Sequence, residues 1–243
     1  MKKISRNLAC LLILCCLFFK TDVFATKELN IAFVGLFGSG KTALRARTTG
    51  KFFDFNERVS TERTDVFDDV LRYYDKNIKC NLFDTSGDED IRNAIIAHRL
   101  NGVDIVVITI DASKNFNEVY KENFTKWIDA INRSYPKLPV ILAATKIDEG
   151  VTLTQMRNKL NSMRDAFSDT CDFEYVMVSA KRETNLGDIN ASDDLGENFW
   201  GRVRYMIQQR NMYDKLNESK VKVFEKGKDD AAYAKEKGKC TLF

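Results

Sequence analysis

The 243-residue sequence is poor in proline, glycine and histidine, with two prolines, twelve glycines and one histidine. So few prolines and glycines exclude collagen-like and low-complexity chains, and a hydrophobic content of 44% is enough to build a core. The single histidine, His98, is interpreted as a surface or half-buried residue and not as a catalytic one, and with one such histidine no histidine-based metal site and no Ser–His triad is expected. Six cysteines are too few for a disulfide scaffold of this length. A net charge of +3 is too small to favour a dedicated nucleic-acid binder, so no nucleic-acid partner is expected.

Residues 1–25 have the pattern of a targeting segment. A basic start precedes an unbroken apolar run from Leu8 to Phe19, and Val23-Phe24-Ala25 then offers a processing site of the small-residue type. Twelve apolar residues form a helix of about 18 Å, short of the roughly 30 Å hydrocarbon core, which disfavours a transmembrane span. Three interpretations stay open: a cleaved signal peptide, a short uncleaved hydrophobic anchor, or a misassigned start codon. The segment carries four basic residues and one acidic residue, so the rest of the chain is neutral.

From Lys27 onward, strand-like and helix-like segments alternate. Strands are expected at residues 29–34, 66–74, 78–83, 104–110, 139–144 and 173–178, with a hairpin turn at 75–77. The runs at 104–110 and 139–144 are continuously apolar and rich in Val and Ile, which is typical of strands buried on both faces. Helices are expected after Lys41, between residues 116 and 131, and from Phe199 to Ile207. This alternation predicts an α/β fold: a six-stranded, mostly parallel sheet with helices on both faces.

The segment Gly35-Leu36-Phe37-Gly38-Ser39-Gly40-Lys41-Thr42 satisfies the phosphate-binding pattern GxxxxGK[ST]. It follows an expected strand and precedes an expected helix, as that pattern requires. Backbone N–H groups of such a loop turn toward phosphate oxygens, and the helix N-terminus adds favourable partial charge. The loop residues expected to bind phosphate in this way are Gly35, Gly38, Ser39 and Gly40. Lys41 can reach the β- and γ-phosphates, and the Thr42 hydroxyl can bind Mg²⁺.

Three further short motifs each follow an expected strand: Asp84-Thr85-Ser86-Gly87, Thr145-Lys146-Ile147-Asp148 and Ser179-Ala180-Lys181. Asp84 can hold the Mg²⁺ shell, and the Gly87 N–H can reach a γ-phosphate. The Asp148 carboxylate suits guanine, because the N1–H and the 2-amino group are both hydrogen-bond donors. Lys146 can lay its aliphatic stem over the base, and the Ala180 N–H can bond the guanine oxygen. Each motif is weak alone, but in this order they predict a guanine-nucleotide site.

With these motifs, residues 27–210 resemble the Ras superfamily of small GTPases, whose P-loop NTPase G domain has the expected fold. The resemblance implies that Thr61 is the switch I threonine that binds Mg²⁺ and that Phe53 is an aromatic residue packed against guanine. The TKID motif and Glu89-Asp90 are similar to Rho proteins, whereas Ser60-Thr61 and Asp65 are similar to Rab proteins, so the subfamily stays unassigned. The expected organisation is a leader at 1–25, a G domain at 27–210 and a tail at 211–243.

The resemblance implies a molecular switch that binds GTP with Mg²⁺, hydrolyses it to GDP, and acts in membrane trafficking or signalling. The γ-phosphate would order two loops, Asp54–Arg63 and Gly87–His98, which then contact effectors, an exchange factor and a GTPase-activating protein. The implied Mg²⁺ ligands are Thr42, Thr61 and Asp84. The implied catalytic residues are Lys41, Thr61, Gly87 and Asp88.

Two residues depart from the family pattern. Asp88 stands where family members usually carry the glutamine that orients the attacking water. Phe37 replaces a residue that is usually small, where a ring would crowd the γ-phosphate and an arginine finger. We therefore expect slow intrinsic hydrolysis and a mainly GTP-bound protein. Two alternatives stay open: another residue positions the water, or the chain is a hydrolysis-deficient pseudo-GTPase that serves as an interaction module.

The sequence ends in Cys240-Thr241-Leu242-Phe243, which fits the prenylation pattern C-a-a-X, although Thr241 is not aliphatic. Lipid attachment at Cys240 and the use of GTP favour the cytosolic face of a membrane. A cleaved leader would instead send the chain into the secretory lumen, so the two ends disagree. One resolution is that the apolar leader is retained as a second anchor, and another is that one end only mimics a targeting signal.

Overall fold

The computed structural model describes residues 27–56, 64–88, 92–114, 118–167, 172–191 and 193–212. The leader at 1–25, the switch I residue Thr61, the pair Glu89-Asp90 and the lipidation candidate Cys240 lie outside these residues. None of the helices in the described part of the chain has both the length and the hydropathy needed to cross a bilayer.

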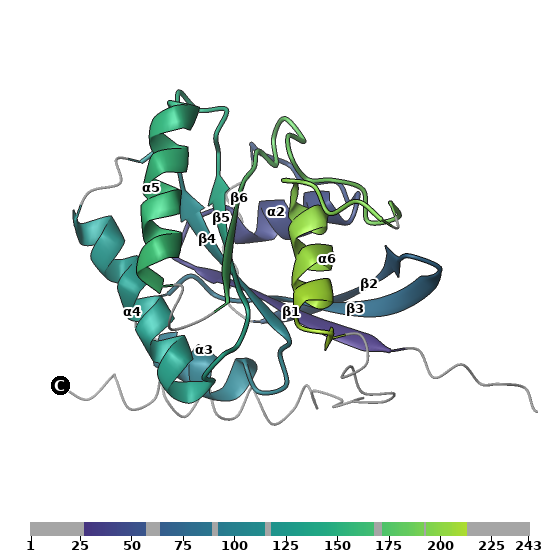
Figure 1. Ribbon diagram of the computed structural model, residues 1–243. Helices are drawn as coiled ribbons and strands as arrows, with labels where there is room; N and C mark the ends of the chain where they lie inside the picture. Colours follow the sequence, from purple (N-terminus) through teal and green to yellow (C-terminus); the bar gives the residue numbers. More distant parts are fainter. Residues whose placement is uncertain are drawn as a thin grey trace, which may run out of the picture.

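One six-stranded sheet forms the centre of the domain (Figure 1). Its strands are β1 (Glu28–Gly35), β2 (Asp65–Tyr73), β3 (Lys76–Asp84), β4 (Ile105–Asp111), β5 (Val140–Thr145) and β6 (Phe173–Met177). They lie in the order β2-β3-β1-β4-β5-β6, and only the β2–β3 pair is antiparallel. Strands β4 and β5 are buried along their whole length, as their continuous apolar runs predict. The expected six-stranded, mostly parallel sheet is confirmed.

The hairpin between β2 and β3 turns earlier than the sequence predicts. Tyr73 pairs with Lys76, so Tyr74 and Asp75 form a two-residue turn, and the turn expected at residues 75–77 is wrong. Tyr74 takes a left-handed backbone conformation with a φ of 52°, which two-residue hairpin turns require and non-glycine residues adopt uncommonly. Its ring packs edge-on against Tyr73, with 4.8 Å between ring centres. Lys76 and Asn77 therefore extend strand β3.

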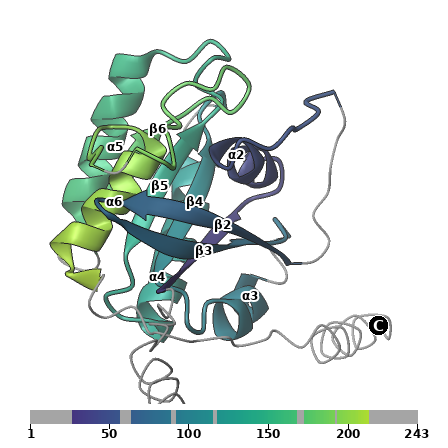
Figure 2. The ribbon, with the colours of Figure 1, turned by 90° about the vertical axis from the view of Figure 1, so that its right-hand side faces the viewer.

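Helices cover both faces of the sheet (Figures 1 and 2). They are α2 (Lys41–Thr48), α3 (Arg92–Arg99), α4 (Glu118–Ser134), α5 (Leu153–Phe167) and α6 (Phe199–Gln209). One core packs α3, α4 and α5 against the sheet through residues such as Ile96, Trp127 and Leu160. The other core packs α2 and α6 against the opposite face through Leu44 and Val203. Helices α3 and α5 were not anticipated from the sequence.

The sheet topology brings the sequence motifs to one edge. The parallel strands β1, β3, β4 and β5 end at Gly35, Asp84, Asp111 and Thr145. The chain order reverses at β1, which has β3 on one side and β4 on the other. In open α/β sheets, ligands bind beyond the carboxyl ends of the strands at such a reversal.

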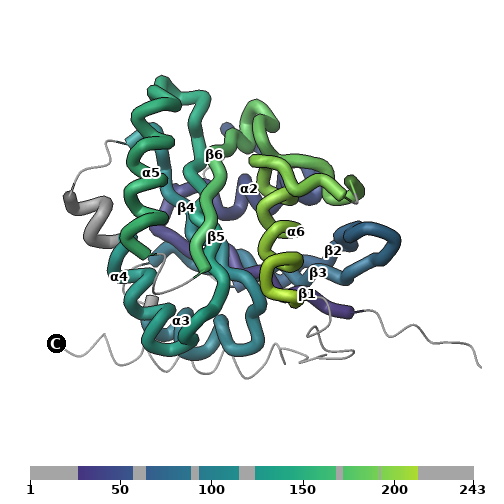
Figure 3. The backbone as a smooth tube through the Cα atoms, viewed as in Figure 1, coloured from purple at the N-terminus to yellow at the C-terminus, as the bar shows by residue number. Residues whose placement is uncertain are grey.

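A connection of 21 residues, 178–198, joins β6 to α6 and passes beside α2 (Figures 2 and 3). The fully buried Arg204 of α6 holds it in place. The Arg204 Nε donates a hydrogen bond to the Arg72 carbonyl of β2, and Nη2 donates to the carbonyls of Asp188 and Ile189. Asn198 caps α6 by accepting a 2.7 Å hydrogen bond from the Gly201 N–H. The connection is therefore fixed to β2 near its turn into β3, where the Arg72 N–H also donates a hydrogen bond to the Ile189 carbonyl.

Candidate functional site

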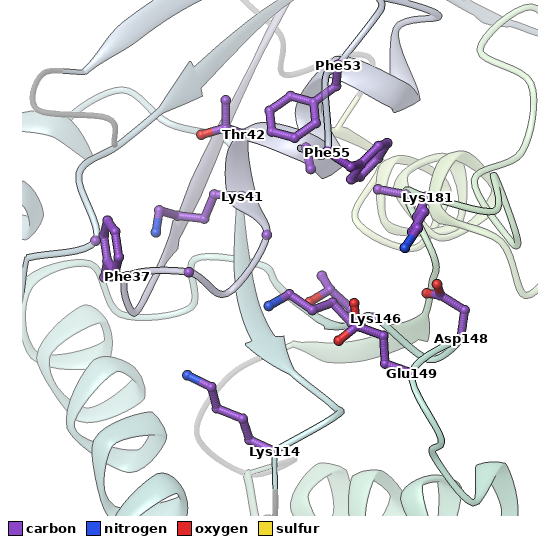
Figure 4. Close-up of a pocket in the computed structure, with 16 residues that line it drawn as sticks. Phe37, Lys41, Thr42, Phe53, Phe55, Lys114, Lys146, Asp148, Glu149 and Lys181 are labelled. Carbon is purple, nitrogen blue, oxygen red and sulfur yellow. The ribbon is translucent and has the colours of Figure 1, made fainter. Parts of the chain in front are cut away.

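A cavity of about 470 Å³ lies over the carboxyl edge of the sheet, a size typical of a small-molecule site. Its lining residues that the sequence predicted are Gly38, Gly40, Lys41, Thr42, Phe53, Gly87, Thr145, Lys146, Asp148, Ala180 and Lys181. Figure 4 shows Phe37 and Lys41 at one end and Lys146, Asp148 and Lys181 at the other. We call residues 35–42 and 84–88 the phosphate end, and residues 111, 145–148 and 179–181 the base end.

The loop Gly35–Thr42 takes a conformation that depends on its glycines. Gly38 and Gly40 have φ values of 72° and 87°, in the left-handed region that favours glycine. At Gly35, a Cβ atom would lie 2.5 Å from the Thr109 carbonyl oxygen, so any side chain would collide with β4. Gly40 is also the N-cap residue of α2, which leaves the N-terminus of that helix at the cavity. This arrangement is suited to binding an anion.

Lys41 lies almost fully buried at the first position of α2. Its Nζ donates hydrogen bonds of 3.0 Å to the carbonyls of Gly35 and Leu36. Burial lowers the pKa of Lys41 to about 8, and the nearby Asp84 carboxylate opposes only part of that shift. A bound polyphosphate would supply the negative charge that this buried ammonium group lacks.

Asp84, the last residue of β3, is 1% exposed. Burial raises the pKa of Asp84, although the Thr42 hydroxyl, Arg45 and Lys41 act in the opposite direction. Neither carboxylate oxygen has a hydrogen-bond partner of normal geometry among the described residues. A buried carboxylate with unsatisfied oxygens beside a hydroxyl fits Mg²⁺, which prefers oxygen ligands and is commonly held by one or two carboxylates together with substrate phosphates. Asp84 and Thr42 therefore fit the metal that the sequence predicts.

Gly87 lies directly against the phosphate loop. A Cβ atom there would be 2.5 Å from the Phe37 N and 2.8 Å from the Lys41 Nζ, so only glycine allows this approach. Asp88 follows, exposed, with its N–H donating to the Ser86 hydroxyl. The Phe37 residue lines the cavity and is 62% exposed. The two departures from the family pattern thus flank Gly87 at the phosphate end.

At the base end, Thr145 connects β5 to the phosphate loop. Its hydroxyl lies 2.7 Å from the Ser39 carbonyl oxygen and 3.0 Å from that of Ile110. Ser39 is also fixed through its side chain, whose oxygen lies 2.6 Å from the Thr109 hydroxyl. The two ends of the cavity are therefore joined by hydrogen bonds between buried groups.

Lys146 and Asp111 form an ion pair that the sequence analysis did not anticipate. The Lys146 Nζ donates to the Asp111 Oδ2 over 2.6 Å, and Asp111 Oδ1 accepts from the Ser113 N–H and hydroxyl. Burial by itself would raise the pKa of Asp111, but the hydrogen bonds from Lys146 and Ser113 outweigh it and lower that pKa. Asp111 thus fixes the ammonium end of Lys146 at the cavity. The only sign of Asp111 in the sequence is its position directly after the apolar run at 104–110.

The Ser179-Ala180-Lys181 motif forms a tight turn. Ser179 pairs with Thr184 in an isolated antiparallel bridge, and the Ser179 hydroxyl accepts from the Arg182 N–H over 2.9 Å. Ala180 and Lys181 line the cavity, whereas Ser179 is fully buried behind them. The turn therefore holds the Ala180 backbone in place without a ligand.

Phe53 lines the cavity together with Phe55, which the sequence analysis missed. The two rings meet edge-on, with 5.0 Å between their centres. The Arg47 guanidinium lies 5.4 Å from the centre of the Phe55 ring and donates a hydrogen bond to Glu183. Lys114 and Glu149 are further lining residues that the sequence analysis did not select.

The other predicted site residues lie behind the lining or beyond the described residues. Gly35, Ser39, Asp84 and Ser179 support the loops that form the cavity wall, and Asp88 lies next to the lining residue Gly87. Thr61 and the lipidation candidate Cys240 fall outside the described part of the chain.

The fold and the site together define an α/β protein of the phosphate-loop class with a nucleotide-sized cavity. Comparison with protein families matches residues 30–192 to the Ras family. The match covers more than half of the sequence, and the chain belongs to this family of small GTPases. The chain is also similar to mouse (Mus musculus) Ras-related protein Rab-7b, with 24% identity over 163 residues, 65% of this chain and 77% of that protein. Ras-family proteins use GTP and GDP, generally with Mg²⁺, and interact with exchange factors, GTPase-activating proteins and effectors.

Proposed function

We propose that this protein is a GTP-binding switch that hydrolyses GTP slowly and is mainly GTP-bound. The observation that carries the proposal is the pair of unusual side chains flanking Gly87, namely Phe37 and Asp88. The ring of Phe37 is exposed at the end of the cavity that contains Lys41, where an arginine finger would have to enter. Asp88 places a carboxylate where the family uses a neutral glutamine, and an ionised carboxylate cannot donate a hydrogen bond.

Different residues of this chain bind the phosphates, the base and the metal. Lys41 and the N–H groups of the phosphate loop bind the phosphates, while Asp148, Lys146 and Ala180 recognise the base. Asp84 and Thr42, with Thr61, would hold Mg²⁺, which neutralises phosphate charge when bound. The effector-facing segments are Asp54–Arg63 and Gly87–His98, and they would be ordered in the GTP state. The second segment was expected to be a loop but includes most of helix α3.

We further propose that the protein acts at the cytosolic face of a membrane, in trafficking or signalling. Membership of the Ras family and the C-a-a-X pattern at Cys240 support this location. The apolar leader would then be a second, retained attachment, because a single lipid chain binds membranes only reversibly.

A second candidate is a hydrolysis-deficient pseudo-GTPase that works as an interaction module. The exposed Phe37 and the acidic Asp88 favour it, since both changes oppose turnover without removing a base- or phosphate-binding group. Identification of the nucleotide that copurifies with the protein separates the two candidates. A mixture of GTP and GDP indicates slow turnover, whereas GTP alone indicates a locked state.

Single-turnover hydrolysis tests the main proposal. We expect a wild-type rate below the usual intrinsic value of about 10⁻⁴ s⁻¹, and a rise of roughly tenfold or more for Asp88→Gln. Phe37→Gly should add to that rise when a GTPase-activating protein is present. Asp68→Asn, which neutralises an exposed carboxylate on β2, is the matched control and should leave the rate unchanged. A wild-type rate at or above about 10⁻⁴ s⁻¹ that Asp88→Gln does not alter would contradict the proposal.

A further inference from the structure

Asp84 has a cationic neighbour besides Lys41. Arg45 lies one helical turn after Lys41 on α2, so the two side chains lie on the same face of the helix. The Arg45 Nη2 is 3.9 Å from the Asp84 Oδ2, and the two side chains are only 9% and 1% exposed. A buried carboxylate proposed to hold Mg²⁺ therefore already faces a fixed positive charge.

Stacking on an aromatic ring holds the Arg45 guanidinium in place. Its Cζ lies 3.5 Å from the centre of the Phe67 ring of β2, a close cation–π contact. The Lys51 Nζ lies farther from the same ring, at 5.4 Å, and the carboxylate of Asp65 adds a favourable charge interaction for Arg45. The buried Arg45 Nε has no hydrogen-bond partner within the described residues. Asp84 is thus the nearest buried anion toward which this cation is held.

We propose that Arg45 is the counter-ion of Asp84 in the metal-free protein and competes with Mg²⁺ for that carboxylate. The inference rests on the proposed function, because it assumes that nucleotide and Mg²⁺ bind at the phosphate end. Arg45 is a positioning residue: it acts on the metal site through Asp84 and contacts no substrate.

Two effects of Arg45 both favour the metal-free state over the Mg²⁺-bound state. In the metal-free state it adds a compensating charge beside a buried carboxylate, which stabilises that state. In the metal-bound state it places a like charge near the cation, which weakens Mg²⁺ binding. Bound nucleotide should therefore begin to dissociate at a higher free Mg²⁺ concentration than it would without Arg45. Once all Mg²⁺ is removed, it should dissociate more slowly than from a variant that lacks the arginine.

The test measures the release rate of a fluorescent GDP analogue from the full chain across a series of free Mg²⁺ concentrations. Arg45→Met should lower the Mg²⁺ concentration at half-maximal retention by about tenfold. The same variant should release nucleotide about tenfold faster in excess chelator. Arg164→Met is the matched control, because it removes the same charge from α5 on the opposite face of the sheet, and it should leave both values unchanged.

Two further variants keep the inference falsifiable if Arg45→Met folds poorly. Arg45→Lys retains the charge and should keep the Mg²⁺ midpoint near the wild-type value. Phe67→Leu removes the ring under the guanidinium and should shift the midpoint in the same direction as Arg45→Met, by about threefold. The inference is overturned if the Mg²⁺ midpoint is unchanged or raised in both Arg45→Met and Phe67→Leu. It is also overturned if Arg45→Lys shifts the midpoint as much as Arg45→Met does. A wild-type protein that binds no guanine nucleotide refutes the proposed function instead, so the two failures are distinguishable.

Discussion

The base end and the phosphate end of the cavity are held in different ways. At the base end, several polar side chains have partners within the protein: Lys146 pairs with Asp111, and Ser179 accepts a backbone N–H. At the phosphate end, Asp84 is buried beside Thr42, Arg45 and Lys41, with no hydrogen bond of normal geometry to its carboxylate oxygens within the described residues, and burial lowers the pKa of Lys41. The base end is thus partly held by contacts within the protein, whereas the phosphate end contains buried charges that are only partly compensated.

This difference suits the base end to recognising the base and the phosphate end to responding to the phosphates and the metal. A preorganised base end loses little conformational freedom on binding, so it can supply specificity in every nucleotide state. Partly compensated buried charges make the phosphate end sensitive to the number of phosphates and to the metal. The departures Phe37 and Asp88 both lie at the phosphate end, so they should alter turnover and leave guanine preference intact.

Loss of the Asp148 carboxylate should have the largest effect. We expect Asp148→Ala to weaken GDP and GTP binding by about 10²- to 10⁴-fold, because two charge-assisted hydrogen bonds to guanine are lost at about 1.5–3 kcal/mol each. Preference for guanine over adenine nucleotides should fall by a similar factor. Equilibrium titration with fluorescent GDP and ADP analogues measures both values.

Glu149→Ala is the matched control for that prediction, because Glu149 is the neighbouring carboxylate on the same cavity wall. It should change GDP affinity by no more than about threefold, since no hydrogen bond to the base is assigned to it. Equal losses in the two variants would show that general charge, and not the Asp148 contact, sets the preference.

The pH dependence of Lys41 should be the next largest effect. Its pKa of about 8 in the nucleotide-free protein must rise when phosphates bind, so binding takes up a proton above pH 8. GDP affinity should be flat below pH 8 and fall by at most about tenfold between pH 8 and 9.

Raising the pH has the opposite effect on the stability of the nucleotide-free protein. The pKa of Lys41 is lower in the folded protein than in the unfolded chain, so the free energy of unfolding increases as pH rises from about 8 toward 10.5.

Calorimetric titration of GDP at several pH values, in buffers of different ionisation enthalpy, measures the proton uptake directly. Lys41→Arg stays charged over this range and reports the pH dependence that the nucleotide contributes by itself. If the slope of the arginine variant equals that of the wild type, the titration of Lys41 is not its cause.

The local motifs could be predicted from the sequence because their function depends on consecutive residues. The glycines and the lysine expected to bind phosphate, for example, all lie within the eight residues 35–42. The buried strands β4 and β5 were equally evident, since each is a continuous apolar run. Helix α5 was missed because only Met156, Leu160 and Met163 of its fifteen residues are buried and the rest of its surface is polar.

Contacts between motifs could not be predicted, because they depend on the order of the strands in the sheet. Asp111 reaches Lys146 since β4 and β5 are neighbours and end in register, with Asp111 opposite Thr145. Arg45 reaches Asp84 because α2 packs on the sheet in the same core as side chains of β3, the strand that ends at Asp84. The turn at Tyr74 was misplaced for a local reason, since tyrosine seldom adopts a left-handed conformation.

The smallest effect is expected at Asp111, which tests whether the preorganised base end matters for binding. Asp111→Asn keeps an oxygen for Ser113 but removes the charge that holds Lys146, so a charge-assisted hydrogen bond becomes a neutral one. We expect GDP to dissociate about three- to tenfold faster, with an association rate changed by less than about twofold, because the ion pair fixes Lys146 in place and does not steer the ligand. Stopped-flow measurement of both rates tests this expectation. Ser113→Ala removes the hydroxyl that donates to Asp111 but leaves the backbone N–H and the Lys146 pair, so its dissociation rate should stay near that of the wild type. Equal acceleration in the two variants would mean that the loop after β4, and not the ion pair, holds the base end together.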